Sequence, residues 1–457
     1  MKKIERFLNS NYYLILITLI GFLTWVMKDD YQQYNEYGML LLLIPMSLIF
    51  MLFENTMYTM PLFATLLYIY NVQGMNLETI SGFHFVYVLF FFLVIGPIVH
   101  LIRFKPTFKK GALFLAFFLS ALAQILSIFY VKVTPTYLQI SLFGFFYLLL
   151  YVFFVSTSKP SLAYVMKIMF FMSLLLSGEI LFNIYQGFQS YGIEIGIKER
   201  IKLGMKTSWG RGDYGWGNIN DVVIHLVLMM PSQVYYLLKY PKRLVLWFFP
   251  LLSSFTIFLS ASRGGYISLG LSILCFAVIL IRYGKRHTYY NGLIALVVTS
   301  LILIKFPVLV ETAVEVFMQG GLDDLDQFSS SRITLYKHAV ELFKQYPIFG
   351  AGWESMTDIG NPNRIQVFHS TLFHTMAVMG SFGLIALVVY FYQTYRLMIE
   401  KRKFEVLFII IGVTVTQIHG LIDNTQFMLV YTFITIILMV SIENNTQIET
   451  KTVPILN

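Results

Sequence analysis

The sequence contains little charge and almost no cysteine. Only 12% of its 457 residues are Asp, Glu, Lys or Arg, whereas 57% are hydrophobic, and a soluble protein carries roughly 25% charged residues. So few charges cannot cover a surface that faces water, which excludes a soluble globular fold and indicates an integral membrane protein. The single cysteine, Cys275, excludes an intrachain disulfide and a cysteine-based zinc site.

The sequence also lacks the motifs of nucleotide-dependent enzymes. It has no glycine-rich phosphate loop and no acidic cluster with convincing metal-ligand spacing, so we expect neither a metal ion nor a cofactor. The net charge of +9 would suit a nucleic-acid partner. Basic loops on the cytoplasmic side of a membrane protein explain that charge more simply, so we expect no nucleic acid.

Long apolar runs dominate the rest of the chain. A transmembrane helix needs about 20 apolar residues, and fourteen candidate runs lie near residues 12–27, 38–53, 56–70, 85–102, 111–131, 136–155, 162–186, 219–238, 243–261, 264–281, 289–310, 369–392, 404–419 and 427–442. The second and third runs are short and stand or fall together. We therefore expect an all-α polytopic membrane protein with 12–14 transmembrane helices.

The charges of the connecting loops predict which side each loop faces. Alternate loops are basic, with Lys and Arg at positions 103–110, 159, 239–243, 282–286 and 396–403, and this bias places them and both termini in the cytoplasm. Two long polar segments, 187–218 and 311–368, then lie outside the cell and carry helical structure. We divide the chain into N-terminal transmembrane helices (1–186), a functional membrane region (187–442) and a cytoplasmic tail (443–457).

Arg263 is the first candidate functional residue. It lies in Ser260-Ala261-Ser262-Arg263-Gly264-Gly265, at the tip of a tight helical hairpin near the outer membrane surface. An arginine at that depth faces a water-filled cavity or an anionic partner. Binding of a lipid phosphate is the alternative.

Arg332 and His369 are two further candidates on the outer side. Three serines precede Arg332 and predict a surface helix over 332–345, with Arg332 on its apolar face and in its first turn. The helix dipole disfavours a cation there, so an anionic ligand would offset the cost; snorkelling of an amphipathic-helix arginine is the alternative. His369 opens the run 369–392, where the dipole favours a neutral imidazole that can act as a general base, although this residue taken alone favours an interfacial N-cap role.

Softer signals come from other outer segments. Arg211 lies in a segment rich in glycine and tryptophan, which suits sugar stacking or an interfacial aromatic belt. Glu179 and His225 could line the same cavity. His419 and Asp423 occupy another outer loop.

The order of these motifs resembles the O-antigen ligase and Wzy-type polysaccharide polymerase superfamily. The Ser-Arg-Gly-Gly hairpin is followed by Arg332, by Pro347-Ile348-Phe349-Gly350-Ala351-Gly352 and by His369-Ser370-Thr371-Leu372 running into Gly380-Ser381-Phe382-Gly383. The stretch Gly210–Asn220 is similar to the family's segment that ends in N-x-N. The resemblance covers roughly residues 205–430, and Ser370 stands where the family commonly has asparagine.

The resemblance implies a metal-independent glycosyltransferase at the outer face of the cell membrane, acting in surface polysaccharide biosynthesis. Its donor would be a glycan on undecaprenyl diphosphate and its acceptor a glycan or another lipid-linked glycan. Arg263 and Arg332 would hold the diphosphate and His369 would orient or deprotonate the acceptor hydroxyl, with Arg211, Asn220 and His419 as substrate-binding residues.

The resemblance does not separate a polymerase from a ligase. It leaves room for a chain-length regulator and a flippase as protein partners. The competing interpretation of the chain is a lipid-linked oligosaccharide flippase or another multi-span transporter, but transporters commonly place their site near the bilayer midplane, within internal repeats. Here the informative residues gather on one side.

Overall fold

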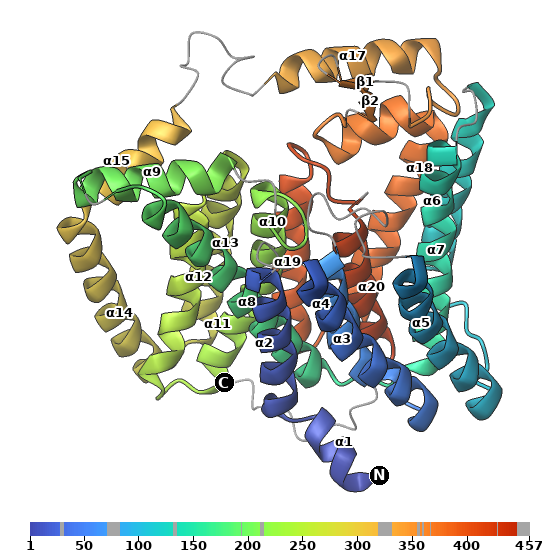
Figure 1. Cartoon of the computed structure of the whole chain (residues 1–457), viewed down its shortest axis with the longest axis horizontal. Helices are drawn as coiled ribbons and strands as arrows, with labels where there is room; N and C mark the ends of the chain where they lie inside the picture. The colour runs from blue at the N-terminus through green and yellow to red at the C-terminus, as the bar shows by residue number, and fades with distance from the viewer. Residues whose placement is uncertain are drawn as a thin grey trace.

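The computed structural model describes residues 1–27, 32–70, 83–130, 135–192, 194–210, 214–318, 331–353, 357–358, 361–365, 367–426 and 428–445. It is almost entirely helical (Figure 1). The N-terminal part contains α1 (Lys2–Leu8), α2 (Asn11–Met27), α3 (Gln32–Leu52), η1 (Thr56–Thr59), α4 (Met60–Tyr70), α5 (Phe83–Phe104), α6 (Phe114–Leu126), η3 (Ser127–Tyr130), α7 (Pro135–Thr157) and α8 (Leu162–Gln189).

The second part follows the same helical pattern. It contains α9 (Ile197–Gly210), α10 (Ile219–Met229), α11 (Pro231–Lys239), η4 (Leu244–Trp247), α12 (Phe248–Leu259), α13 (Arg263–Tyr283), α14 (Arg286–Lys305), α15 (Pro307–Phe317), α17 (Arg332–Gln345), β1 (Thr357–Asp358), β2 (Asn361–Ile365), α18 (Thr371–Glu400), α19 (Phe404–His419) and α20 (Leu429–Glu443). The strands β1 and β2 form one small antiparallel hairpin.

The expected all-α membrane architecture is confirmed. Among the described residues, seven helices are long and apolar enough to cross a membrane, and the bent pair α1–α2 could form an eighth. Six shorter apolar helical segments coincide with the remaining predicted runs. Whether these shorter segments also cross the bilayer, and which side each end faces, stays a prediction from hydropathy and loop charge.

One end of the helix bundle gathers the connections that matter for the site. Helix α17 lies across this end, above α18, and α1 lies at the opposite end (Figure 1). Helices α10, α13 and α18 begin at the α17 end, and α19 ends there. This placement follows from the polar network described below, to which a residue at that terminus of each helix belongs. The connection between α18 and α19 therefore lies at the far end, as do the connections that follow α11 and α13.

A turn before β1 packs backbone to backbone against α18. The peptide N–H groups of Ala351 and Gly352 donate to the carbonyls of Ala377 and Val378, at 2.8 and 3.1 Å. Gly380 interrupts the helix with φ 62° and ψ −157°. A Cβ on Gly380 would lie 2.6 Å from the backbone of Gly350, so the two glycines permit the contact. The predicted run 369–392 is thus a broken helix.

Candidate functional site

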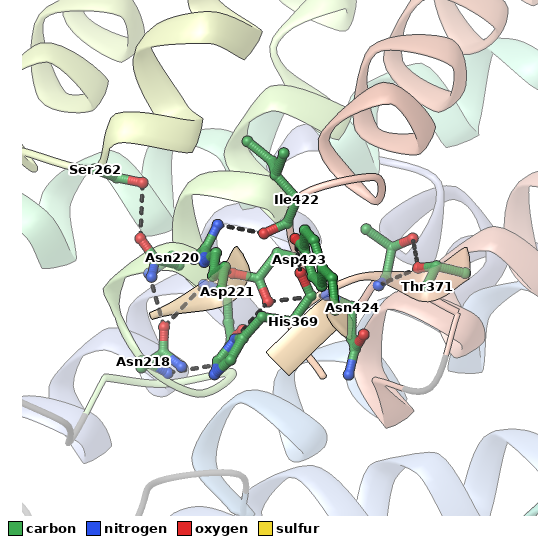
Figure 2. A network of polar contacts seen from close by, with 12 residues as sticks. Asn218, Asn220, Asp221, Ser262, His369, Thr371, Ile422, Asp423 and Asn424 are labelled. Carbon is green, nitrogen blue, oxygen red and sulfur yellow. Dashed lines mark hydrogen bonds and ion pairs between the residues drawn. The ribbon is translucent and has the colours of Figure 1, made fainter. Parts of the chain in front are cut away.

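Three segments far apart in the sequence meet at the carboxylate of Asp423. This residue lies in the loop between α19 and α20, with its side chain 10% exposed. The imidazole Nδ1 of His369 lies 3.2 Å from Asp423 Oδ1, and Arg332 Nη2 lies 3.5 Å from Oδ2. Arg332 also donates from Nη1 to the carbonyl of Ile422. Figure 2 shows His369, Ile422 and Asp423 side by side in this network.

The start of α18 holds His369 in place. Ser370 is the N-cap, and its hydroxyl accepts a hydrogen bond from the peptide N–H of Phe373. The next residue, Thr371, donates its N–H to the carbonyl of Gly420 at 2.8 Å and accepts the N–H of Thr425 at 3.0 Å. The loop that carries Asp423 is therefore fastened to the helix that His369 precedes.

Helix α17 covers this junction. The Tyr336 hydroxyl donates to the backbone carbonyl of His369 at 2.9 Å, and the Tyr336 ring stacks on Phe373 with 4.3 Å between centroids. The structure confirms the predicted helix 332–345, and its half-buried face, including Tyr336, lies on α18. Arg332 thus points toward the protein, in agreement with the amphipathic pattern.

Arg263 lies at the neighbouring helix start. Ser262 is the N-cap of α13 and accepts the N–H of Gly265 at 3.1 Å. The Ser262 hydroxyl donates to Oδ1 of Asn220 at 2.7 Å, as Figure 2 shows. The charge of Arg332 acts on Arg263, so the two guanidinium groups lie within electrostatic range of each other.

The start of α10 completes this side of the network. Asn218 and Asp221 form a capping box, in which Asn218 Oδ1 accepts the N–H groups of Asn220 and Asp221. The Asp221 carboxylate in turn accepts the N–H of Asn218 at 2.9 Å. The charge of Asp423 also acts on Asp221. The α10 start and the Asp423 loop are therefore neighbours, as Figure 2 shows.

The remaining predicted residues take different places. His419 is buried, and its Nδ1 lies 2.8 Å from the Ser268 hydroxyl. A Cβ on Gly264 would lie 2.8 Å from the His419 ring, so this histidine fits the close approach of α13 and α19. Its assignment to substrate binding stays a prediction, as does that of Asn220. Arg211 lies outside the described residues.

The electrostatics of the site depend on Asp423. Burial alone would raise the pKa of its carboxyl, but the hydrogen bond and charge of His369, together with the charge of Arg332, lower that pKa below its ordinary value. The carboxylate is therefore ionised at neutral pH. It stabilises the tautomer of His369 that carries its proton on Nδ1, which leaves Nε2 as an acceptor. The side chain of His369 is 35% exposed, so a substrate can approach it.

The central role of Asp423 could not be assigned from the sequence alone. The pattern marks Asp423 only as a polar residue in an outer loop. Its partners His369 and Arg332 lie 54 and 91 positions away. No spacing rule connects residues at such separations.

Comparison with known families agrees with the motifs. Residues 248–388 match the family model described as O-antigen ligase. The matched stretch includes Arg263, Arg332 and His369 and ends before Asp423. No curated protein matches the chain. The resemblance drawn from the motifs is thus confirmed over residues 248–388, the stretch that is similar to the O-antigen ligase family.

Proposed function

We propose that the protein is a glycosyltransferase that transfers a glycan from undecaprenyl diphosphate to a glycan acceptor at the outer face of the cell membrane. The observation that carries this proposal is the meeting of His369 and Arg332 at Asp423, with Arg263 in electrostatic range. Two guanidinium groups suit a diphosphate, because each offers several N–H donors in a planar fork. An exposed imidazole beside them suits proton removal.

The proposed reaction assigns one role to each group. His369 Nε2 takes the proton of the acceptor hydroxyl while the oxygen of that hydroxyl attacks the anomeric carbon of the donor. The bond from the anomeric carbon to the diphosphate oxygen breaks, and the electron pair leaves with the undecaprenyl diphosphate. Arg263 and Arg332 stabilise the negative charge that develops there. Asp423 orients His369 and stabilises the imidazolium that forms, as a buried carboxylate does in a hydrolytic triad.

The distribution of basic residues supports an outward-facing site. Three helical segments that start at the site end, α10–α11, α13 and α18, each lead into a cluster of Lys and Arg. These clusters lie at 239–243, 282–286 and 401–403. They therefore lie at the opposite end of the bundle. Because loops rich in Lys and Arg tend to stay in the cytoplasm, we expect the site end to face the outside of the cell.

A reconstituted system tests the proposal. Purified protein in liposomes, given lipid-linked repeat units and no energy source, is expected to lengthen the glycan. His369→Ala should abolish lengthening while insertion into the membrane is retained. The exposed His287 of α14 follows the basic connection at the far end, so His287→Ala is a matched control that should keep full activity.

Two results would contradict this function. Normal lengthening by the His369→Ala variant removes the base from the mechanism. Movement of unchanged glycan across the liposome membrane would instead identify a flippase. Lipid-linked glycans from a deletion strain then separate the two transfer reactions, because a missing polymerase leaves single repeats and a missing ligase leaves long chains.

A further inference from the structure

A carboxyl group that the proposed reaction does not use lies buried in the bundle. Glu179 belongs to α8 and its side chain is fully buried. A carboxyl group inside a membrane protein is costly unless it has polar partners, and such residues mark functional positions. One partner of Glu179 lies in the turn that leads into α10.

Glu179 holds this turn through its backbone. Its Oε1 accepts the peptide N–H of Gly215 at 2.5 Å. A Cβ on Gly215 would lie 2.3 Å from the ring of Tyr68, so the turn lies directly against that ring. Trp216 packs edge-on against Tyr68 and donates from Nε1 to the carbonyl of Ala64 at 3.1 Å. The glutamate, the tyrosine and the Trp216 contacts together hold the turn in place.

The turn has a strained backbone that needs such support. Trp216 has φ 66° and Gly217 has φ 122°. The first value is a left-handed conformation that a bulky residue rarely adopts, and it persists only where the surroundings impose it. A Cβ on Gly217 would lie 2.2 Å from the carboxylate of Asp221, so the turn closes directly onto the start of α10.

A continuous series of contacts leads from the turn to Arg263. Asn218 follows the turn and binds the N–H of Asn220 at 2.8 Å. Asn220 accepts the hydroxyl of Ser262 at 2.7 Å, and Ser262 caps the helix whose first residue is Arg263. A shift of the turn would therefore move Asn218, Asn220 and Ser262 in sequence, and with Ser262 the backbone at Arg263.

We propose that Glu179 is a positioning residue that sets the place of Arg263, and thereby the affinity of the site for a lipid diphosphate, by fixing the turn at Gly215. This inference rests on the proposed function, because it takes Arg263 to bind the diphosphate. Glu179 itself does not touch the substrate. The required chemistry is a hydrogen-bond acceptor at this position, and a negative charge is not needed.

Binding of undecaprenyl diphosphate to the full-length purified protein tests the inference. Glu179→Leu keeps the volume of the side chain but removes the acceptor, and it is expected to weaken binding about tenfold, equivalent to about 1.4 kcal/mol. Glu179→Gln retains an acceptor oxygen and should bind within about twofold of the wild type, since only the charge is lost. This rescue separates the acceptor contact from simple loss of a buried acid.

Glu443 provides a matched control. Its carboxylate also accepts a backbone N–H, from Ala112 at 2.9 Å, and lies 2.6 Å from a tyrosine hydroxyl, that of Tyr151. It ends α20, about 21 Å along that helix from its start beside the site. Glu443→Leu should leave diphosphate binding unchanged. An equal loss in this variant would show general destabilisation and overturn the inference.

The Arg263→Ala variant distinguishes the two proposals. It should weaken binding at least as much as Glu179→Leu, and the double variant should bind no more weakly than Arg263→Ala alone, since the two residues act in series. Wild-type binding by Arg263→Ala would refute the diphosphate role of that arginine. Weak binding by Arg263→Ala with unchanged binding by Glu179→Leu would refute only the positioning role.

A second variant covers the case in which Glu179→Leu does not fold. Ser262→Ala removes the last hydrogen bond in the series, the one to Asn220, and with it the cap contact to the N–H of Gly265 at the start of α13. It should weaken diphosphate binding several-fold, because Arg263 follows directly. Unchanged binding would show that the series does not position the arginine.

Discussion

Replacing Asp423 by asparagine isolates the electrostatic role of the site's central carboxylate. The substitution keeps the size of the side chain and one oxygen, whereas in the wild type Oδ1 faces both His369 Nδ1 and the N–H of Asn424. It removes the charge that faces both His369 and Arg332. An amide NH2 must also point toward one of these two partners, and a guanidinium has no acceptor to offer it.

The amide oxygen is therefore expected to stay with the charged guanidinium of Arg332, so that the NH2 turns toward His369 and the hydrogen bond from the N–H of Asn424 is lost. A donor at Nδ1 stabilises the opposite tautomer, with the proton on Nε2, where the acceptor hydroxyl must deliver its own proton. General-base catalysis contributes about 10²- to 10⁴-fold to a rate. We expect kcat for glycan lengthening to fall by this factor, which corresponds to about 3 to 5 kcal/mol of activation free energy.

The measurement is the initial rate of lengthening by purified protein at saturating lipid-linked donor. Asp423→Glu should recover part of the activity, because it restores the charge at a slightly different distance. Thermal unfolding in detergent checks that the Asp423→Asn variant is folded. A kcat within threefold of the wild type would refute the tautomer role, and so would a loss confined to KM.

Three further predictions follow from the same contacts. Because the pKa of Asp423 is lowered, its stabilising effect is present above its ordinary pKa of 3.8 and is lost as the pH falls below it; the difference in unfolding temperature between wild type and Asp423→Asn should therefore shrink in acid, and a constant difference would contradict the ion pair. Gly380→Ala should destabilise the protein by about 1–3 kcal/mol or more in thermal unfolding, because its φ is positive and its Cβ would meet the backbone near Gly350. Gly270→Ala in α13 is the control, with open space around its Cβ, and should be neutral or slightly stabilising. Activity should persist in EDTA, since arginines supply the charge that neutralises the diphosphate, and loss of activity restored by a divalent cation would contradict this.

The helices could be predicted from the sequence because each depends on a local signal, an apolar run or a capping residue. The apolar run at 219–238 and the three serines before Arg332 predict α10–α11 and α17 to within about two residues. The predicted run 289–310 extends too far, since α14 ends at Lys305. Pro307 begins the next helix there, because proline has no N–H to continue the first one.

The parts that the sequence did not reveal depend on long-range contacts. Gly380 looks like an ordinary glycine of a transmembrane run, and only its pairing with Gly350 shows why the helix breaks there. Asp423 is one polar residue in a loop until α17 and α18 bring Arg332 and His369 to it. The arginines and the histidine could be proposed because cations at outer helix starts are unfavourable without an anion, whereas a carboxylate in a loop carries no such signal.

The charge balance of the site end explains how Arg263 and Arg332 can lie close together when no diphosphate is bound. Asp423 neutralises part of the charge of Arg332 and orients His369. At the far end, Arg396 pairs with Glu400 one turn along its own helix, and Lys159 pairs with Glu54. A diphosphate that reaches Arg332 must then compete with Asp423, whose 3.5 Å contact to the guanidinium is long for an ion pair.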